Sequence, residues 1–94
     1  MEVSVKFLAS IRKIVDAHEI GFEIGTGSTV EHLLEILKSR FGTAFKNAVG
    51  EPFEDENPKI RILVNGRDID FLQGAKTGLK EGDTVVLIPP VAGG

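Results

Sequence analysis

The sequence predicts a single α+β domain in which a mixed sheet of four to five strands packs on one main helix. Two observations support this prediction. Apolar residues alternate with a period of two near both ends of the chain, and one amphipathic segment with helical spacing lies between them. A chain of 94 residues has room for one hydrophobic core and no second domain.

The N-terminal part predicts two strands joined by a short helical segment. Val3, Val5 and Phe7 share one face of the first strand, the face expected to meet the core. Residues 9–17 change to helical spacing, which indicates one or two helical turns. Residues 19–24 alternate again, so we expect a second strand that pairs with the first as a hairpin.

The main helix is expected to begin at Ser28, which with Glu31 three residues later fits a capping box. Gly42 is expected to end the helix. Residues 43–59 have no sustained period, two prolines and four acidic residues, and they predict a long surface loop. The helix carries a single apolar stripe, formed by Val30, Leu33, Leu34, Leu37 and Phe41.

The C-terminal part predicts three more segments of sheet. Residues 60–64 alternate, Asn65-Gly66 is typical of a two-residue hairpin turn into a short fourth strand, and residues 84–88 form a β-branched run. The first and last strands are the most apolar, so we expect them side by side and parallel at the centre, each flanked by a hairpin partner. This arrangement is the β-grasp layout.

Composition excludes several classes of function. With 14 acidic and 11 basic residues the net charge is -3, so the chain lacks the basic footprint that binds nucleic acid or an anionic membrane. The absence of cysteine excludes disulfides, iron–sulfur ligation, thiolate zinc sites and a cysteine nucleophile. His18 and His32 lie in different elements and do not predict a metal site. No apolar run reaches the roughly 18 residues of a membrane span, so we expect a cytoplasmic protein.

The face of the sheet opposite the helix is predicted to carry an apolar patch. Eight residues are expected to face the helix: Val3, Val5, Phe7, Ile60, Ile62, Val64, Val85 and Leu87. Strict alternation then places Leu8, Leu63, Val86 and Ile88 on the opposite face. We interpret these four side chains, next to the C-terminus, as a docking face for a partner protein. The alternative is that the loop over residues 43–59 folds across them.

The last six residues, Pro-Pro-Val-Ala-Gly-Gly, predict an extended, flexible tail on a globular domain of residues 1–88. Two prolines fix φ and stiffen the exit. Gly93 and Gly94 have no side chains that would clash with the walls of a narrow enzyme channel. The α-carboxyl, with a pKa of about 3.5, is an anion at neutral pH and needs no base to act as a nucleophile. We therefore predict that Gly94 is the reactive residue; the alternative is a merely frayed end.

Several stretches, covering nearly the whole chain, resemble the sulfur-carrier branch of the ubiquitin-like proteins, in particular the MoaD family. The stretches are Val3 to Arg12, Thr29-Val30-Glu31, Ile62 to Gly66, Leu79 to Asp83, and above all Pro89-Pro90-Val91-Ala92-Gly93-Gly94. The resemblance implies a subunit that is not itself an enzyme and binds no cofactor. It also implies that the patch and residues 89–92 contact partners.

The same resemblance implies a reaction sequence at Gly94. A MoeB-like activating enzyme uses ATP to adenylate the carboxylate, and a sulfur donor protein converts it to a thiocarboxylate. A MoaE-like large subunit then transfers that sulfur into molybdopterin.

Other functions stay open at this point. A ubiquitin-like protein modifier joins its C-terminal glycine to lysines of other proteins. A related carrier serves thiamine thiazole synthesis, which the length of this chain and Pro89-Pro90 disfavour. A plain binding module with an inert tail is the third alternative.

Overall fold

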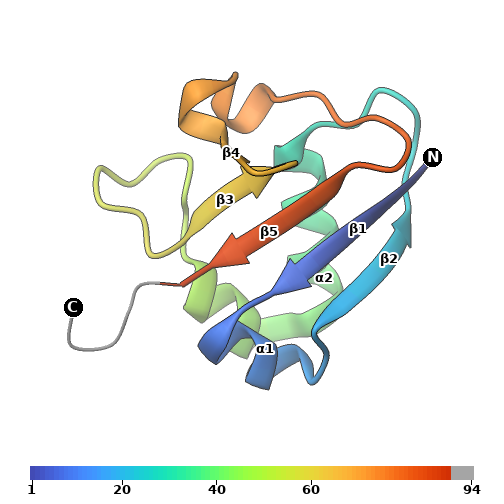
Figure 1. The fold of residues 1–94 in the computed structure, drawn as a ribbon. Helices are drawn as coiled ribbons and strands as arrows, with labels where there is room; N and C mark the ends of the chain where they lie inside the picture. The colour runs from blue at the N-terminus through green and yellow to red at the C-terminus, as the bar shows by residue number, and fades with distance from the viewer. Residues whose placement is uncertain (90–94) are drawn as a thin grey trace.

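The computed structural model describes residues 1–89 and shows a β-grasp fold in which five strands form one mixed sheet (Figure 1). The sheet order is β2-β1-β5-β3-β4. The strands are β1 (Glu2–Phe7), β2 (Glu19–Glu23), β3 (Arg61–Val64), β4 (Arg67–Asp68) and β5 (Thr84–Ile88). The helices are α1 (Ala9–Val15), α2 (Val30–Val49) and two short 3₁₀ turns, η1 (Ile69–Phe71) and η2 (Gly74–Lys76).

The two most apolar strands lie at the centre of the sheet, as predicted. β1 and β5 run parallel, with Val5 opposite Val85 and Phe7 opposite Leu87. β2 pairs antiparallel with β1, and β3 pairs antiparallel with β5. A strand paired on both sides has its backbone groups fully used in the ladder, so the end of β5 is held in place by two neighbours.

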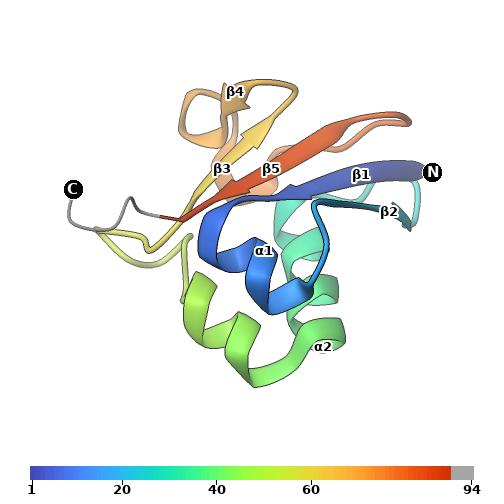
Figure 2. The same cartoon turned by 60° about the horizontal axis from the view of Figure 1, so that its bottom comes forward.

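The core lies between the sheet and the helices α1 and α2, which cover the same face of the sheet (Figure 2). All eight residues predicted to face the helix are buried, and so are the first four residues of the predicted helical stripe. The fifth, Phe41, is partly buried and packs its ring edge-to-face against Phe7, with ring centroids 5.8 Å apart. The period of two in the strands and the helical spacing in residues 30–41 therefore identify the inner surfaces of the sheet and of the helix.

The segment predicted as a loop over residues 43–59 is helical in its first part, so that prediction was wrong. Gly42 does interrupt the helix, with φ of +79°, a conformation that glycine adopts without a steric penalty. The chain then resumes helical geometry to Val49 because Phe45 and Val49, one turn apart, are both fully buried. The true connection to β3 begins at Gly50.

The N-cap of α2 is Thr29, one residue later than the predicted Ser28. The Thr29 hydroxyl accepts a hydrogen bond from the backbone N–H of His32 at 3.3 Å. Ser28 instead donates its hydroxyl proton to the carbonyl of Gly25 at 2.6 Å. Glu31 does not close a capping box; its carboxylate pairs with Lys76 at 3.2 Å.

The Asn65-Gly66 turn has the predicted hairpin geometry, with φ of +51° and +86° at the two residues. The fourth strand that follows has only two residues before the chain enters η1. Within residues 1–89, no helix has both the length and the apolar character needed to cross a membrane.

Candidate functional site

The residues predicted to react, Gly93 and Gly94, lie outside the described residues, together with Pro90, Val91 and Ala92. The described chain ends at Pro89, directly after the central strand β5. Ile88 is the last paired residue of that strand and lies opposite Arg61 of β3. On the other side, the backbone N–H of Leu8 donates to the carbonyl of Leu87. The tail therefore starts from a point that both neighbouring strands fix.

The four residues of the predicted docking face are all partly exposed on the outer side of the sheet. Leu63 and Val86 are direct cross-strand partners on β3 and β5. Ile88 lies one step further along the same face of β5. Leu8 follows β1 directly in extended conformation, and its N–H donates to the carbonyl of Leu87. The sheet thus brings these side chains together where the tail begins, whereas Pro89 itself is buried.

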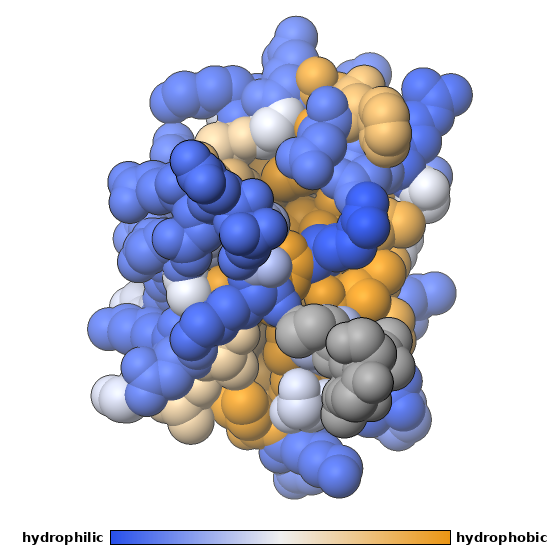
Figure 3. Space-filling view, turned by 90° about the vertical axis from the view of Figure 1, so that its left-hand side faces the viewer, coloured by the Kyte–Doolittle hydropathy of each residue, from blue (hydrophilic) through white to orange (hydrophobic). Residues whose placement is uncertain are grey.

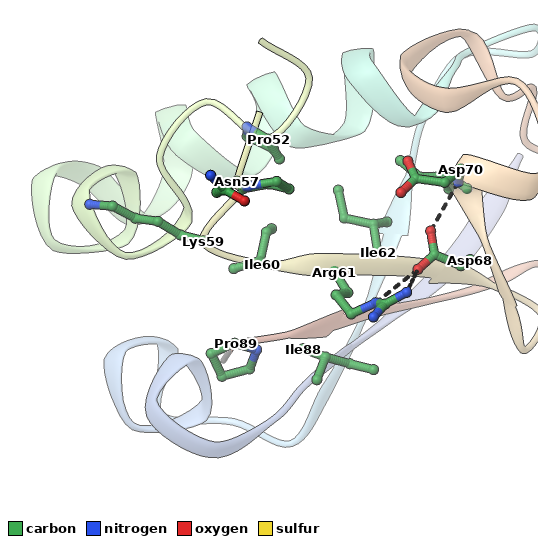
Figure 4. Close-up of a pocket in the computed structure, with 12 residues that line it drawn as sticks. Pro52, Asn57, Lys59, Ile60, Arg61, Ile62, Asp68, Asp70, Ile88 and Pro89 are labelled. Atoms are coloured by element: carbon green, nitrogen blue, oxygen red, sulfur yellow. Dashed lines mark hydrogen bonds and ion pairs between the residues drawn. The ribbon is translucent and has the colours of Figure 1, made fainter. Parts of the chain in front are cut away.

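An ion pair that the sequence did not reveal borders this patch. The carboxylate oxygen Oδ2 of Asp68 accepts a hydrogen bond from Arg61 Nε at 3.0 Å, and Arg61 Nη2 lies 2.9 Å from the same oxygen in the ion pair (Figure 4). The other oxygen, Oδ1, accepts the backbone N–H of Asp70 at 2.9 Å. That backbone hydrogen bond lowers the pKa of Asp68 most, desolvation by burial opposes it, and the bonded, charged Arg61 lowers it further.

Asp68 also controls the geometry of η1, because its bond to Asp70 caps that 3₁₀ turn. The turn presents Phe71, whose side chain is a large exposed hydrophobic group at 83% of its full accessibility. A shallow hollow lies beside it, lined by Arg61, Leu63, Gly66, Arg67, Asp68, Phe71 and Ile88. Exposed aromatic groups next to an apolar hollow are typical of a contact surface.

A second groove, of about 500 Å³, lies between β3 and the connection that follows α2. Pro52, Asn57 and Lys59 of that connection form one wall, and Ile88 and Pro89 form the other (Figure 4). The space-filling view shows hydrophobic surface hollowed between hydrophilic side chains at this end of the molecule (Figure 3). The connection flanks the groove and leaves the four docking-face residues partly exposed, so it does not fold across them.

The part of the chain from residue 1 to residue 89 holds no group of three or more His, Asp and Glu side chains arranged to bind a metal ion. His18 is exposed before β2 and His32 is exposed in the first turn of α2.

The comparisons of this chain with known proteins agree with one another. The sequence matches the ThiS family over residues 5–94. It is 33% identical over 96 residues to small archaeal modifier protein 3 of Haloferax volcanii, with both chains covered completely. It is 29% identical over 94 residues to the molybdopterin synthase sulfur carrier subunit of Chlamydomonas reinhardtii, again with complete coverage of both.

A solved structure adds a relative in a protein complex. The complex of subunits 1 and 2 of the molybdopterin-converting factor from Helicobacter pylori contains a chain that is 26% identical, with a TM-score of 0.68 and complete coverage of both chains. Sulfur carriers of this kind are not catalysts, and this chain is non-catalytic on its own. The fold and the match across nearly the whole length show that the chain belongs to the ThiS family, whose relatives here are small sulfur carriers and ubiquitin-like modifiers.

Proposed function

We propose that this chain is the small, sulfur-carrying subunit of a molybdopterin synthase. The observation that supports this most is the sequence Pro-Pro-Val-Ala-Gly-Gly directly after a central strand anchored on both sides. A fixed base and a terminus without bulky side chains are the two properties that a carboxylate needs to enter another enzyme's active site. The relative from Chlamydomonas reinhardtii, a sulfur carrier subunit aligned from end to end, supports the same proposal.

The proposed chemistry takes place at the Gly94 carboxylate. An activating enzyme of the MoeB kind transfers AMP from ATP to this carboxylate and releases pyrophosphate. The acyl-adenylate carbon is then attacked by a sulfur nucleophile from a donor protein, and AMP leaves with one of the original carboxylate oxygens. The nucleophile is the outer sulfur of a persulfide on the donor, so its attack gives an acyl disulfide. A thiol then attacks the inner sulfur, a disulfide forms between that thiol and the donor, and the thiocarboxylate of Gly94 leaves. A large subunit of the MoaE kind uses that sulfur for the dithiolene of molybdopterin.

The docking face has a defined place in this proposal. Leu8, Leu63, Val86 and Ile88 lie on the outer face of the sheet near the end of β5, so a partner that binds there holds the carrier where the tail begins and can receive the terminus in its active site. Such a partner gains binding energy from the body of the carrier while the reacting end needs only a narrow channel.

Intact-mass measurement tests the proposal directly. The full chain is incubated with a MoeB-type activating enzyme, ATP and sulfide, in parallel with a variant that lacks Gly93 and Gly94. We expect the full chain alone to gain the mass difference between one sulfur and one oxygen, with pyrophosphate release that depends on the chain. Failure of the full chain to become adenylated contradicts the proposal.

A second function, protein modification through Gly94, is favoured by the 33% identity to a small archaeal modifier protein. In cells that express a tagged chain, conjugation produces tag-reactive bands of higher mass that survive reduction. Tryptic digestion then leaves residues 81–94, the segment after the last lysine of the chain, as a remnant attached to the modified lysine. A pure carrier yields no such remnant but restores molybdopterin synthesis to a strain that lacks its own small subunit.

A further inference from the structure

Arg61, Asp68 and Phe71 form one structural unit at the border of the docking face. A single carboxylate, that of Asp68, holds the guanidinium of Arg61 with one oxygen and caps the turn that carries Phe71 with the other (Figure 4). The Asp68 side chain is only 13% exposed, while that of Arg61 is 68% exposed. The buried acid therefore positions two groups that face solvent.

The guanidinium keeps hydrogen-bonding capacity for another molecule. Arg61 uses Nε and Nη2 on Asp68, and an arginine side chain has five N–H donors in a fixed fork. Among residues 1–89 its Nη1 group has no hydrogen-bond acceptor. The exposed phenyl ring of Phe71 and the apolar side chains of Leu63 and Ile88 line the same hollow.

The charge around the hollow is opposite in sign to that of the whole molecule. The chain has a net charge of -3, yet the residues that line the hollow include Arg61 and Arg67 with the single carboxylate of Asp68. A positively charged, partly apolar hollow is complementary to an acidic group next to an apolar one. Ile88 lines the hollow and directly precedes Pro89, so a partner that binds here is also at the base of the tail.

We propose that this hollow binds a surface carboxylate and a neighbouring apolar side chain of the enzyme that adenylates Gly94, with the carboxylate on Arg61 and the apolar group between Phe71 and Leu63. This inference rests on the proposed function, because that function supplies the partner. Asp68 acts in it as a positioning residue, because its carboxylate holds Arg61 and caps the turn of Phe71 while its side chain is only 13% exposed.

Steady-state adenylation kinetics test this inference. The activating enzyme encoded in the same genome is assayed by pyrophosphate release with increasing concentrations of the full-length chain. We expect Arg61→Gln to raise the KM for the chain about tenfold and to leave kcat within about twofold, because binding is weakened and the reacting end is unchanged. Phe71→Ala is expected to raise KM in the same way.

The matched control is Lys80→Gln, which removes the same charge from an exposed position in the turn that precedes β5. It should leave KM unchanged. Asp68→Asn should raise KM because Asp68 positions Arg61 and the turn of Phe71. The KM of the original chain should rise with salt more steeply than that of Arg61→Gln, because the variant has lost one charged contact.

The outcomes separate the two proposals. If the original chain is adenylated and Arg61→Gln has the same KM as Lys80→Gln, the hollow is not the docking site and the proposed function stands. If the original chain is not adenylated at all, the proposed function and this inference both fail. Urea unfolding of each variant shows whether a raised KM comes from loss of the fold.

Discussion

Asn65 and Asp83 join the turn after β3 to the turn before β5 through a side-chain hydrogen bond, in which Asn65 Nδ2 donates to Asp83 Oδ1 at 2.9 Å. The other oxygen of Asp83 accepts the backbone N–H of Lys80 at 2.8 Å. Asn65 Oδ1 in turn accepts the backbone N–H of Thr84 at 2.9 Å. The pair thus fixes the register in which β5 enters the sheet, at the end opposite the tail.

Asp83→Asn should destabilise the protein by about 1 to 3 kcal/mol, because an amide nitrogen then meets an N–H donor where the carboxylate had an acceptor. Asp83 is buried, so water does not replace the lost partner. Urea unfolding at neutral pH measures the change. Asp55→Asn, at an exposed position, is the matched control and should leave the unfolding free energy unchanged. Equal values for the two variants contradict the structural role of the Asn65–Asp83 pair.

Phe45→Ala should cost about 3 to 5 kcal/mol, as expected for removal of a fully buried phenyl ring. Phe45 lies in the part of α2 after Gly42 and packs on Phe41, with ring centroids 5.6 Å apart. Phe71→Ala makes the same chemical change at an exposed site and should alter stability by less than about 0.5 kcal/mol. Thermal or urea unfolding compares the two. A small loss for Phe45→Ala shows that the segment after Gly42 does not contribute to the core.

The contrast between Phe45 and the rest of α2 shows where sequence reasoning succeeded and where it failed. Alternation predicted the inner faces of the strands, because a residue on the wrong face is costly in a core this thin. The continuation of α2 was missed because Gly42 was interpreted as the C-terminal cap that ends the helix. The spacing of Phe45 and Val49, one helical turn apart, was the available signal. Gly42 does break the helix, and the helical segment that follows it is packed into the core by the buried ring of Phe45.

The candidate site was predicted in part for a similar reason. Leu8, Leu63, Val86 and Ile88 followed from the alternation of the strands. The Arg61–Asp68 pair did not, because it depends on the register set by the Asn65-Gly66 turn and on a fourth strand that is only two residues long. The exposed Phe71 depends in turn on the cap from Asp68. Contacts of this kind need both the register and the side-chain directions, which a single sequence does not supply.

Asp68→Asn should change how stability depends on pH. The folded-state pKa of Asp68 lies below its ordinary value of 3.8, mainly through the N–H of Asp70. The ionised carboxylate therefore stabilises the fold fully above that value, and the contribution is lost as the pH falls through the folded pKa. Unfolding free energies of both proteins, measured from neutral pH to pH below 3.8, should differ most at neutral pH and converge in acid. A difference that stays constant over this range contradicts the depressed pKa.

Leu63→Gln should weaken binding of the activating enzyme by about tenfold or more while the fold remains intact. Leu63 lies on the outer face beside Val86, so a polar side chain there loses apolar contact with a partner and little contact with the core. Ile14→Gln makes a comparable apolar-to-amide change on α1, where the side chain is 37% exposed and the helix lies on the other face of the sheet (Figure 2). Titration calorimetry of the full-length variants with the enzyme gives both affinities. If Leu63→Gln binds as tightly as Ile14→Gln, the outer face of the sheet is not where the enzyme holds its carrier, and the tail alone must supply the recognition.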